Sequence, residues 1–177
     1  NLTNKDRTEH TTIYKRNSDD KGIVISAADT ELSAAEGYLY NDKDIISDGN
    51  VSLIAKEGLE NYSHNIYAVD NITLHATDGN VVNSSALESY KGDVKIVADS
   101  GSVVNLSGGD IVALGGDVVL EANGDTKDAT GNVRTVIVDG KTYQYGSVVN
   151  YGDIIAINAN AQGDDKAAKG EINLKSA

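Results

Sequence analysis

The sequence contains no cysteine, so a disulfide, a zinc–thiolate site, an iron–sulfur cluster and a thiol nucleophile are all excluded. Its three histidines, His10, His64 and His75, do not stand at the spacing of metal ligands. Lys and Arg number 15 against 27 Asp and Glu, which gives a formal net charge of −12. Because Lys and Arg supply the affinity for a phosphate backbone, this balance argues against nucleic-acid binding. We expect no metal ion, no cofactor and no nucleic-acid partner.

Phenylalanine, tryptophan, methionine and proline are also missing, so the apolar interior must be built from Val, Ile, Leu and Ala with nine Tyr. No apolar run approaches the roughly 20 residues that a membrane-spanning helix needs, and we expect no membrane insertion. The chain does not begin with Met, and we expect no signal peptide within it. We therefore expect one domain over residues 1–177, excised from a longer protein.

A seven-residue block with the pattern Gly-Asp-Val-x-Leu-x-Ala recurs along the chain. Clear copies begin at Gly49, Asp70, Gly92 and Gly116, and degenerate copies begin at Gly22 and Gly170. In each copy the apolar residues occupy alternate positions, which places them on one face of a β-strand. The block predicts one interior column made of Ile23, Val51, Ile72, Val94, Val118 and Ile172.

Two further blocks follow the first in a fixed order. The second block, Gly-Ser-Val-Val-Asn and its variants, ends at Asn61, Asn83, Asn105 and Asn150. The third block, Asp/Asn-Ile-x-Ala, appears at 44–46, 65–68, 110–113 and 153–156, and Leu87 stands where a further copy is due. Three short strands therefore recur every ~21–24 residues, which is the signature of a stacked repeat. We interpret the asparagines as a stacked amide ladder at a bend.

Three strands per coil, separated by Gly-Asp or Gly-Asn corners, predict an all-β parallel β-helix of about five coils. Equivalent strands of successive coils would pair in parallel at ~4.8 Å. The narrow interior has little room for aromatic rings, which accounts for the missing Phe and Trp. The absence of proline fits too, because each strand must donate hydrogen bonds to a ladder.

Segments that interrupt the repeat are expected to lie outside the stack. Residues 123–145 include two alternating runs around Asp139-Gly140, a strong signal for a two-residue β-hairpin. We read 157–169 as a polar loop, 34–43 as a third insertion, and 1–21 as an incomplete coil.

The three blocks together resemble the haemagglutinin repeats of filamentous-haemagglutinin-type exoproteins, over roughly residues 22–177 apart from the hairpin and the later loop. That family comprises large Gram-negative two-partner-secretion proteins, including contact-dependent inhibition effectors. The resemblance implies a right-handed β-helical rod that a partner outer-membrane transporter secretes to the cell surface. It also implies adhesion and virulence, with a receptor or glycan of a host or neighbouring cell as partner. The resemblance implies no catalytic residue.

Two other functions stay open from the residues. Some parallel β-helices are carbohydrate-active enzymes that use carboxylates on one outer face, and Asp110, Asp117 and Asp153 are candidates. These residues occupy corner positions, where Asp ordinarily caps a turn, so we expect no enzymatic activity. His75 looks like an outward residue without a partner. The other alternative is a self-assembling fibre or surface-layer subunit.

The hairpin is the feature with the clearest potential for binding. Tyr and Arg are the residues most enriched at interface hot spots. The candidate partner-binding residues are Arg134, Asp139, Gly140, Lys141, Tyr143 and Tyr145. The competing interpretation is that the hairpin folds back over a sheet and its tyrosines shield the backbone.

Overall fold

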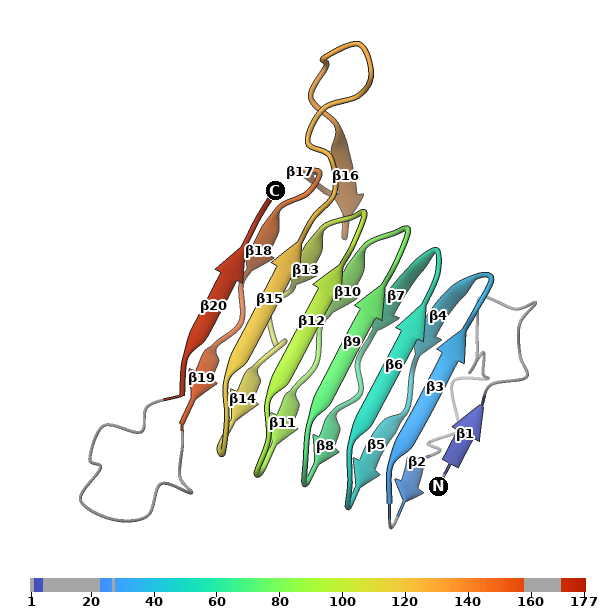
Figure 1. Ribbon diagram of the computed structural model, residues 1–177, viewed down its shortest axis with the longest axis vertical. Coiled ribbons are helices and arrows are strands. Elements are labelled where there is room, and N and C mark those ends of the chain that lie inside the picture. Colours follow the sequence, from blue (N-terminus) through green and yellow to red (C-terminus); the bar gives the residue numbers. More distant parts are fainter. Residues whose placement is uncertain (1, 5–22, 27, 158–169) are drawn as a thin grey trace.

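The computed structural model describes residues 2–4, 23–26, 28–157 and 170–177, and all of its regular elements are strands. Successive strands visit three parallel sheets in turn (Figure 1). The chain climbs the front sheet, crosses to the sheets behind and returns one step further along, which is a right-handed coil (Figure 1). The predicted β-solenoid is confirmed. Within the described ranges no helix is long and apolar enough to span a membrane.

The largest sheet has seven strands, and most of them come from the first repeated block. In spatial order they are β1 (Leu2–Asn4), β3 (Thr30–Ala34), β6 (Val51–Ala55), β9 (Ile72–Ala76), β12 (Val94–Ala98), β15 (Val118–Ala122) and β20 (Ile172–Lys175). The register aligns like positions, so that Leu53 pairs with Leu74 and Leu74 with Ile96. The alternation of the block therefore becomes a column of side chains that are buried from β3 to β15 and exposed at β20.

The second sheet has five strands, one from each of five levels of the stack, and so spans about four turns. Its order is β18 (Val148–Asn150), β13 (Val103–Asn105), β10 (Val81–Asn83), β7 (Gly58–Asn61) and β4 (Tyr38–Asn41). The third sheet has six strands, in the order β19 (Ile154–Ala156), β14 (Ile111–Ala113), β11 (Leu87–Ser89), β8 (Ile66–Ala68), β5 (Asp44–Ser47) and β2 (Ile23–Ser26). Leu87 pairs with Ile66 and Ile111, as the repeat predicts.

The core is a single cluster of aliphatic side chains between the three sheets. Leu53, Ile72, Leu74, Ile96 and Leu120 are fully buried within it. Each level contributes similar residues at the same positions, so side chains of one size pack above each other. This packing removes several strongly apolar side chains per coil from water, the main favourable term in folding.

The first coil corrects two predictions. Strand β2, which carries Ile23, belongs to the six-stranded sheet, where Ile23 pairs with Asp44 rather than with Val51. In the preceding coil the residue that pairs with Val51 is Thr30, one repeat length earlier in the sequence. Because Thr30 is polar, the pattern of apolar residues did not identify this copy of the block.

The segment 34–43 is likewise part of the regular coil and not an insertion. It contains β4, whose Tyr38 pairs with Gly58 and whose Asn41 pairs with Asn61. Large tyrosines in place of the small residues of other copies hid the second block here. The expected incomplete coil over 1–21 and the loop over 157–169 lie almost wholly outside the described residues; β1 and Ile157 are described.

Candidate binding groove

The predicted hairpin consists of β16 (Thr135–Val138) and β17 (Lys141–Gln144), which pair in antiparallel fashion (Figure 1). The two turn residues, Asp139 and Gly140, have φ of 48° and 71°. Positive φ at both positions is the requirement of the tight turn that matches the twist of the strands. The side chains of this hairpin therefore take the expected register, with Val138 opposite Lys141.

The hairpin folds back onto the outer face of the five-stranded sheet. Val82, Val104 and Leu106 of that face are buried, and Val138 and Tyr143 pack against them. In a plain solenoid these outward-facing side chains would meet water. Tyr143 is therefore part of the sheet cover.

The remaining hairpin side chains are also engaged within the chain. The Tyr145 hydroxyl donates to the carbonyl of Ser100 at 2.6 Å, and the Arg134 guanidinium lies 4.0 Å from the centre of the Tyr145 ring. The Lys141 ammonium lies 5.0 Å from the centre of the Tyr151 ring. Arg134, Lys141, Tyr143 and Tyr145 thus make contacts within the hairpin or with the rod, and Asp139 at the hairpin tip lies beside the sheet.

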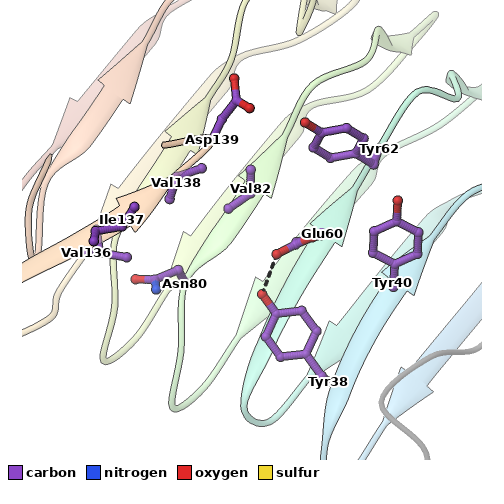
Figure 2. A pocket seen from close by; sticks show the side chains of 10 residues that line it. All are labelled: Tyr38, Tyr40, Glu60, Tyr62, Asn80, Val82, Val136, Ile137, Val138 and Asp139. Atoms are coloured by element: carbon purple, nitrogen blue, oxygen red, sulfur yellow. Dashed lines mark hydrogen bonds between the residues drawn. The ribbon is translucent and has the colours of Figure 1, made fainter. Parts of the chain in front are cut away.

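A groove of about 340 Å³ lies between the hairpin and three successive coils, those of β4, β7 and β10 (Figure 2). One wall is formed by hairpin residues and the other by outward residues of β4, β7 and β10. The lining residues are Tyr38, Tyr40, Glu60, Tyr62, Asn80, Val82, Val136, Ile137, Val138 and Asp139. Three tyrosines and two carboxylates therefore face one hollow.

Tyr38 is fixed at one end of this groove. Its ring lies over Gly58, where a β-carbon would come within 2.4 Å of the ring. Its hydroxyl donates to Oε1 of Glu60 at 2.8 Å (Figure 2). Burial first, and then the hydrogen bond and the charge of Glu60, raise the pKa of the Tyr38 phenol far above its usual value.

Tyr40 and Tyr62 form the wall further along. Their ring centres are 6.4 Å apart and their planes are inclined by 21°, which is a stacked arrangement. The pKa of Tyr40 is raised by burial and then by the nearby charges of Glu60 and Asp42. The rings and carboxylates thus share a negative, partly dry surface.

A second hollow of about 430 Å³ lies on the other side of the hairpin tip. Its lining residues are Tyr62, Ser63, Ser84, Leu106, Ser107, Asp139, Lys141 and Tyr151. Tyr62 and Asp139 line both hollows, so the two hollows adjoin at the hairpin tip. Tyr151 is 52% exposed there, although Lys141 lies over its ring.

Sequence reasoning missed Glu60 and Tyr62 as candidates. Both flank Asn61, whose side chain points into the core, so the alternation of a strand places them on the outer face. This alternation could have identified both residues from the sequence. The position of the hairpin over this face could not be predicted, because nothing in the local sequence fixes the direction in which an insertion folds.

The predicted asparagines form a continuous ladder of side-chain amides. Nδ2 of Asn61 donates to Oδ1 of Asn83 at 2.8 Å, Asn83 donates to Asn105 at 2.8 Å, and Asn105 donates to Asn150 at 2.7 Å. Asn41 extends the ladder by one step, donating to Asn61 at 2.7 Å. All but Asn150 are buried, so the ladder holds the corner together and offers no site to a ligand.

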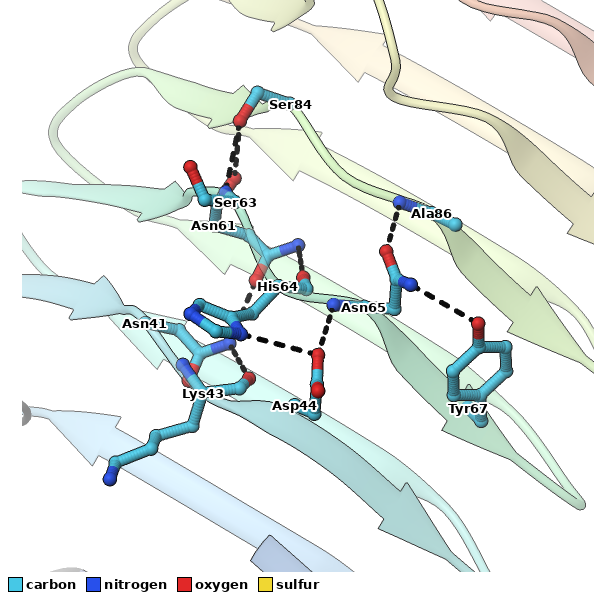
Figure 3. A network of polar contacts seen from close by, with 10 residues as sticks. All are labelled: Asn41, Lys43, Asp44, Asn61, Ser63, His64, Asn65, Tyr67, Ser84 and Ala86. Atoms are coloured by element: carbon cyan, nitrogen blue, oxygen red, sulfur yellow. Dashed lines mark hydrogen bonds and ion pairs between the residues drawn. The ribbon is translucent and has the colours of Figure 1, made fainter. Parts of the chain in front are cut away.

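The polar network around this corner has the same structural role (Figure 3). Oδ1 of Asp44 accepts from the backbone N–H of Asn65 at 2.8 Å and lies 3.3 Å from Nδ1 of His64. Oδ1 of Asn65 in turn accepts from the N–H of Ala86 in the next coil. These side chains bridge successive coils where no strand ladder exists.

Two of the three carboxylates considered for catalysis, those of Asp110 and Asp117, bind backbone at corners, and Asp153 supplies a backbone N–H to one of them. Oδ1 of Asp110 accepts from the N–H of Asp153 at 3.1 Å, and Oδ1 of Asp117 accepts from the N–H of Glu171 at 2.8 Å. Within the described ranges, no group of three His, Asp or Glu residues is arranged to hold a metal ion.

His75, expected to have no partner, does have one. Its Nε2 lies 2.7 Å from Oδ2 of Asp99 on the outer face of the seven-stranded sheet. The pair shares a shallow hollow with Lys95 and Glu121, which come from the two following coils. His75, Lys95 and Glu121 lie on the outer face of neighbouring strands, whereas Asp99 follows the end of β12.

No protein-family model, curated protein or solved structure matches the chain. The β-solenoid itself is established by the strand pairing, whereas the resemblance to filamentous haemagglutinin gains no support from relatives.

Proposed function

We propose that the chain is a non-enzymatic segment of a large secreted exoprotein, acting as an adhesin that presents a binding groove on a rigid rod. The groove between the hairpin and Tyr38, Tyr40 and Tyr62 is the observation that carries this proposal. The partner would be a receptor or glycan on a host or neighbouring cell, and the parent protein would reach the surface through a partner outer-membrane transporter.

Several features of the groove support recognition over a purely mechanical role. The hairpin covers only part of the five-stranded sheet and leaves tyrosines accessible beside it. Ile137 at the edge of the groove is 71% exposed. Aromatic side chains in a hollow with a few fixed polar groups are the usual composition of a binding site. A rigid solenoid also lowers the entropy cost of binding, because the groove is formed in advance.

The test is binding of the purified protein to intact bacterial and epithelial cells. The double variant Tyr40→Ala/Tyr62→Ala removes the groove wall, and Tyr67→Ala/Tyr90→Ala removes two tyrosines on the outside of the six-stranded sheet. We expect the first to abolish binding and the second to leave it intact; because Tyr62 also packs against the buried valines, circular dichroism must show that both variants remain folded. Equal binding by all three proteins would refute a role for the groove.

The hollow around His75 favours a second candidate function, a carbohydrate-active enzyme. His75, Asp99, Lys95 and Glu121 converge there from neighbouring coils, and side chains of these types perform general acid and base chemistry. Turnover of polyuronates or glycosaminoglycans that disappears in His75→Ala would establish this function in place of the first.

A further inference from the structure

The charge of the binding groove restricts its ligand. Among its lining residues, Glu60 and Asp139 carry carboxylates, and there is no Lys, Arg or His. Burial and the charge of Glu60 both raise the pKa of Tyr38 and of Tyr40, so these two phenols add no cation-neutralising or opposing charge of their own. An anionic ligand, such as a sulfated glycan, would meet like charge here, in a chain of net charge −12.

Glu60 is held in a position to receive a cation. The Tyr38 hydroxyl donates to one carboxylate oxygen, which orients the group without neutralising it. Over the part of the chain that the structure describes, the ion pairs involve other carboxylates, and none joins Glu60 to a Lys, Arg or His. A partly buried carboxylate beside aromatic rings is most stable when a cation pairs with it.

The chain already uses the same chemistry at two other places around the hairpin. There Arg134 lies over Tyr145, and Lys141 lies over Tyr151. Within the described ranges, no such cation lies over Tyr38, Tyr40 or Tyr62. Cation–π contacts gain most where water is partly excluded, as it is between the hairpin and the sheet.

The remaining wall suits the aliphatic part of a basic side chain. Val136 and Val138 line the hairpin side of the groove, and Val82 lies beside Glu60 in the neighbouring strand. Lys and Arg lay their methylene stems along apolar surface while the charged head reaches a polar group. The groove adjoins the second hollow at Tyr62 and Asp139, which leaves room for an extended chain; because Lys141 lines that second hollow, the basic side chain belongs in the first.

We propose that this groove binds a basic peptide segment of a partner protein, with an Arg or Lys side chain between Glu60 and the tyrosines. The inference rests on the proposed adhesin function and names the chemistry of its ligand. The tyrosine faces hold the cation, Glu60 pairs with it, and the valines contact its stem.

The test is a fluorescence-anisotropy titration with a labelled peptide of alternating arginine and glycine, using the whole chain. We expect saturable binding that weakens with added salt, because charges at the surface are screened. Glu60→Gln keeps the shape of the side chain and removes its charge, and should raise the Kd about tenfold, the usual worth of a charged hydrogen bond. Glu88→Gln makes the same charge change on β11 in the six-stranded sheet, and should leave the Kd unchanged.

Three results would overturn the inference. Equal weakening by Glu60→Gln and Glu88→Gln would mean that the peptide responds to net charge alone. Saturable binding of a neutral oligosaccharide such as chitohexaose, with no binding of the peptide, would make the groove a glycan site. If the peptide fails to bind while Tyr40→Ala/Tyr62→Ala still abolishes cell binding, this inference fails and the proposed function stands. If the peptide does not bind and the groove variant does not affect cell binding, both the inference and the proposed function are refuted.

Discussion

Substitution of one asparagine inside the amide ladder tests how much the corner contributes to stability. The Asn83 side chain donates to the Ser85 carbonyl and to Oδ1 of Asn105, and accepts from Nδ2 of Asn61, each at 2.8 Å. Asn83→Ala removes all three hydrogen bonds, at about 1 kcal/mol each. It also leaves buried acceptors on Asn105 and Ser85 without this donor, which adds to the cost. We expect the free energy of unfolding to fall by about 3–5 kcal/mol.

The control is the ladder's last member. Asn150 is exposed, accepts from Asn105 and donates to the Gly152 carbonyl, so water can replace its partners. Asn150→Ala should cost about 1 kcal/mol. Urea unfolding followed by circular dichroism measures both variants, with an unchanged denaturant slope showing that the same surface unfolds. If the two substitutions cost the same, the buried ladder does not stabilise the stack and the reasoning is wrong.

The remaining predictions concern the core, the phenol and the hairpin. Leu74→Ala at a fully buried position should cost ~2–5 kcal/mol, whereas Leu174→Ala, in the same column but 54% exposed, should cost far less; thermal melting distinguishes them. The pKa of Tyr38 is raised in the folded state, so just above pH ~10 only the unfolded chain releases this proton and the free energy of unfolding should fall as the pH rises. In Tyr38→Phe the free energy of unfolding should fall less steeply over the same range, which denaturation at a series of alkaline pH values measures. Deleting Val133–Tyr145 uncovers the sheet and should lower the melting temperature, whereas an unchanged value would show that the cover contributes nothing.

The repeat determined most of the architecture from sequence alone. Alternating Val, Leu and Ala in one block and an asparagine ending the next specify which face each residue takes, because the period of a strand is two. The Asp139-Gly140 turn was equally local, since positive φ at two adjacent residues depends on those residues themselves. These features needed no knowledge of distant contacts.

The first coil and the groove depended on tertiary structure. Thr30 and Tyr38 do not resemble their counterparts in other coils, and only pairing with β6 and β7 showed that they occupy equivalent positions. The direction in which the hairpin folds was decided by the outward valines Val82 and Val104, which it buries. Local propensity sets the strands and the turn, but the burial of surfaces far apart in the sequence sets where they meet, and this burial brings Glu60 and the tyrosines into one groove.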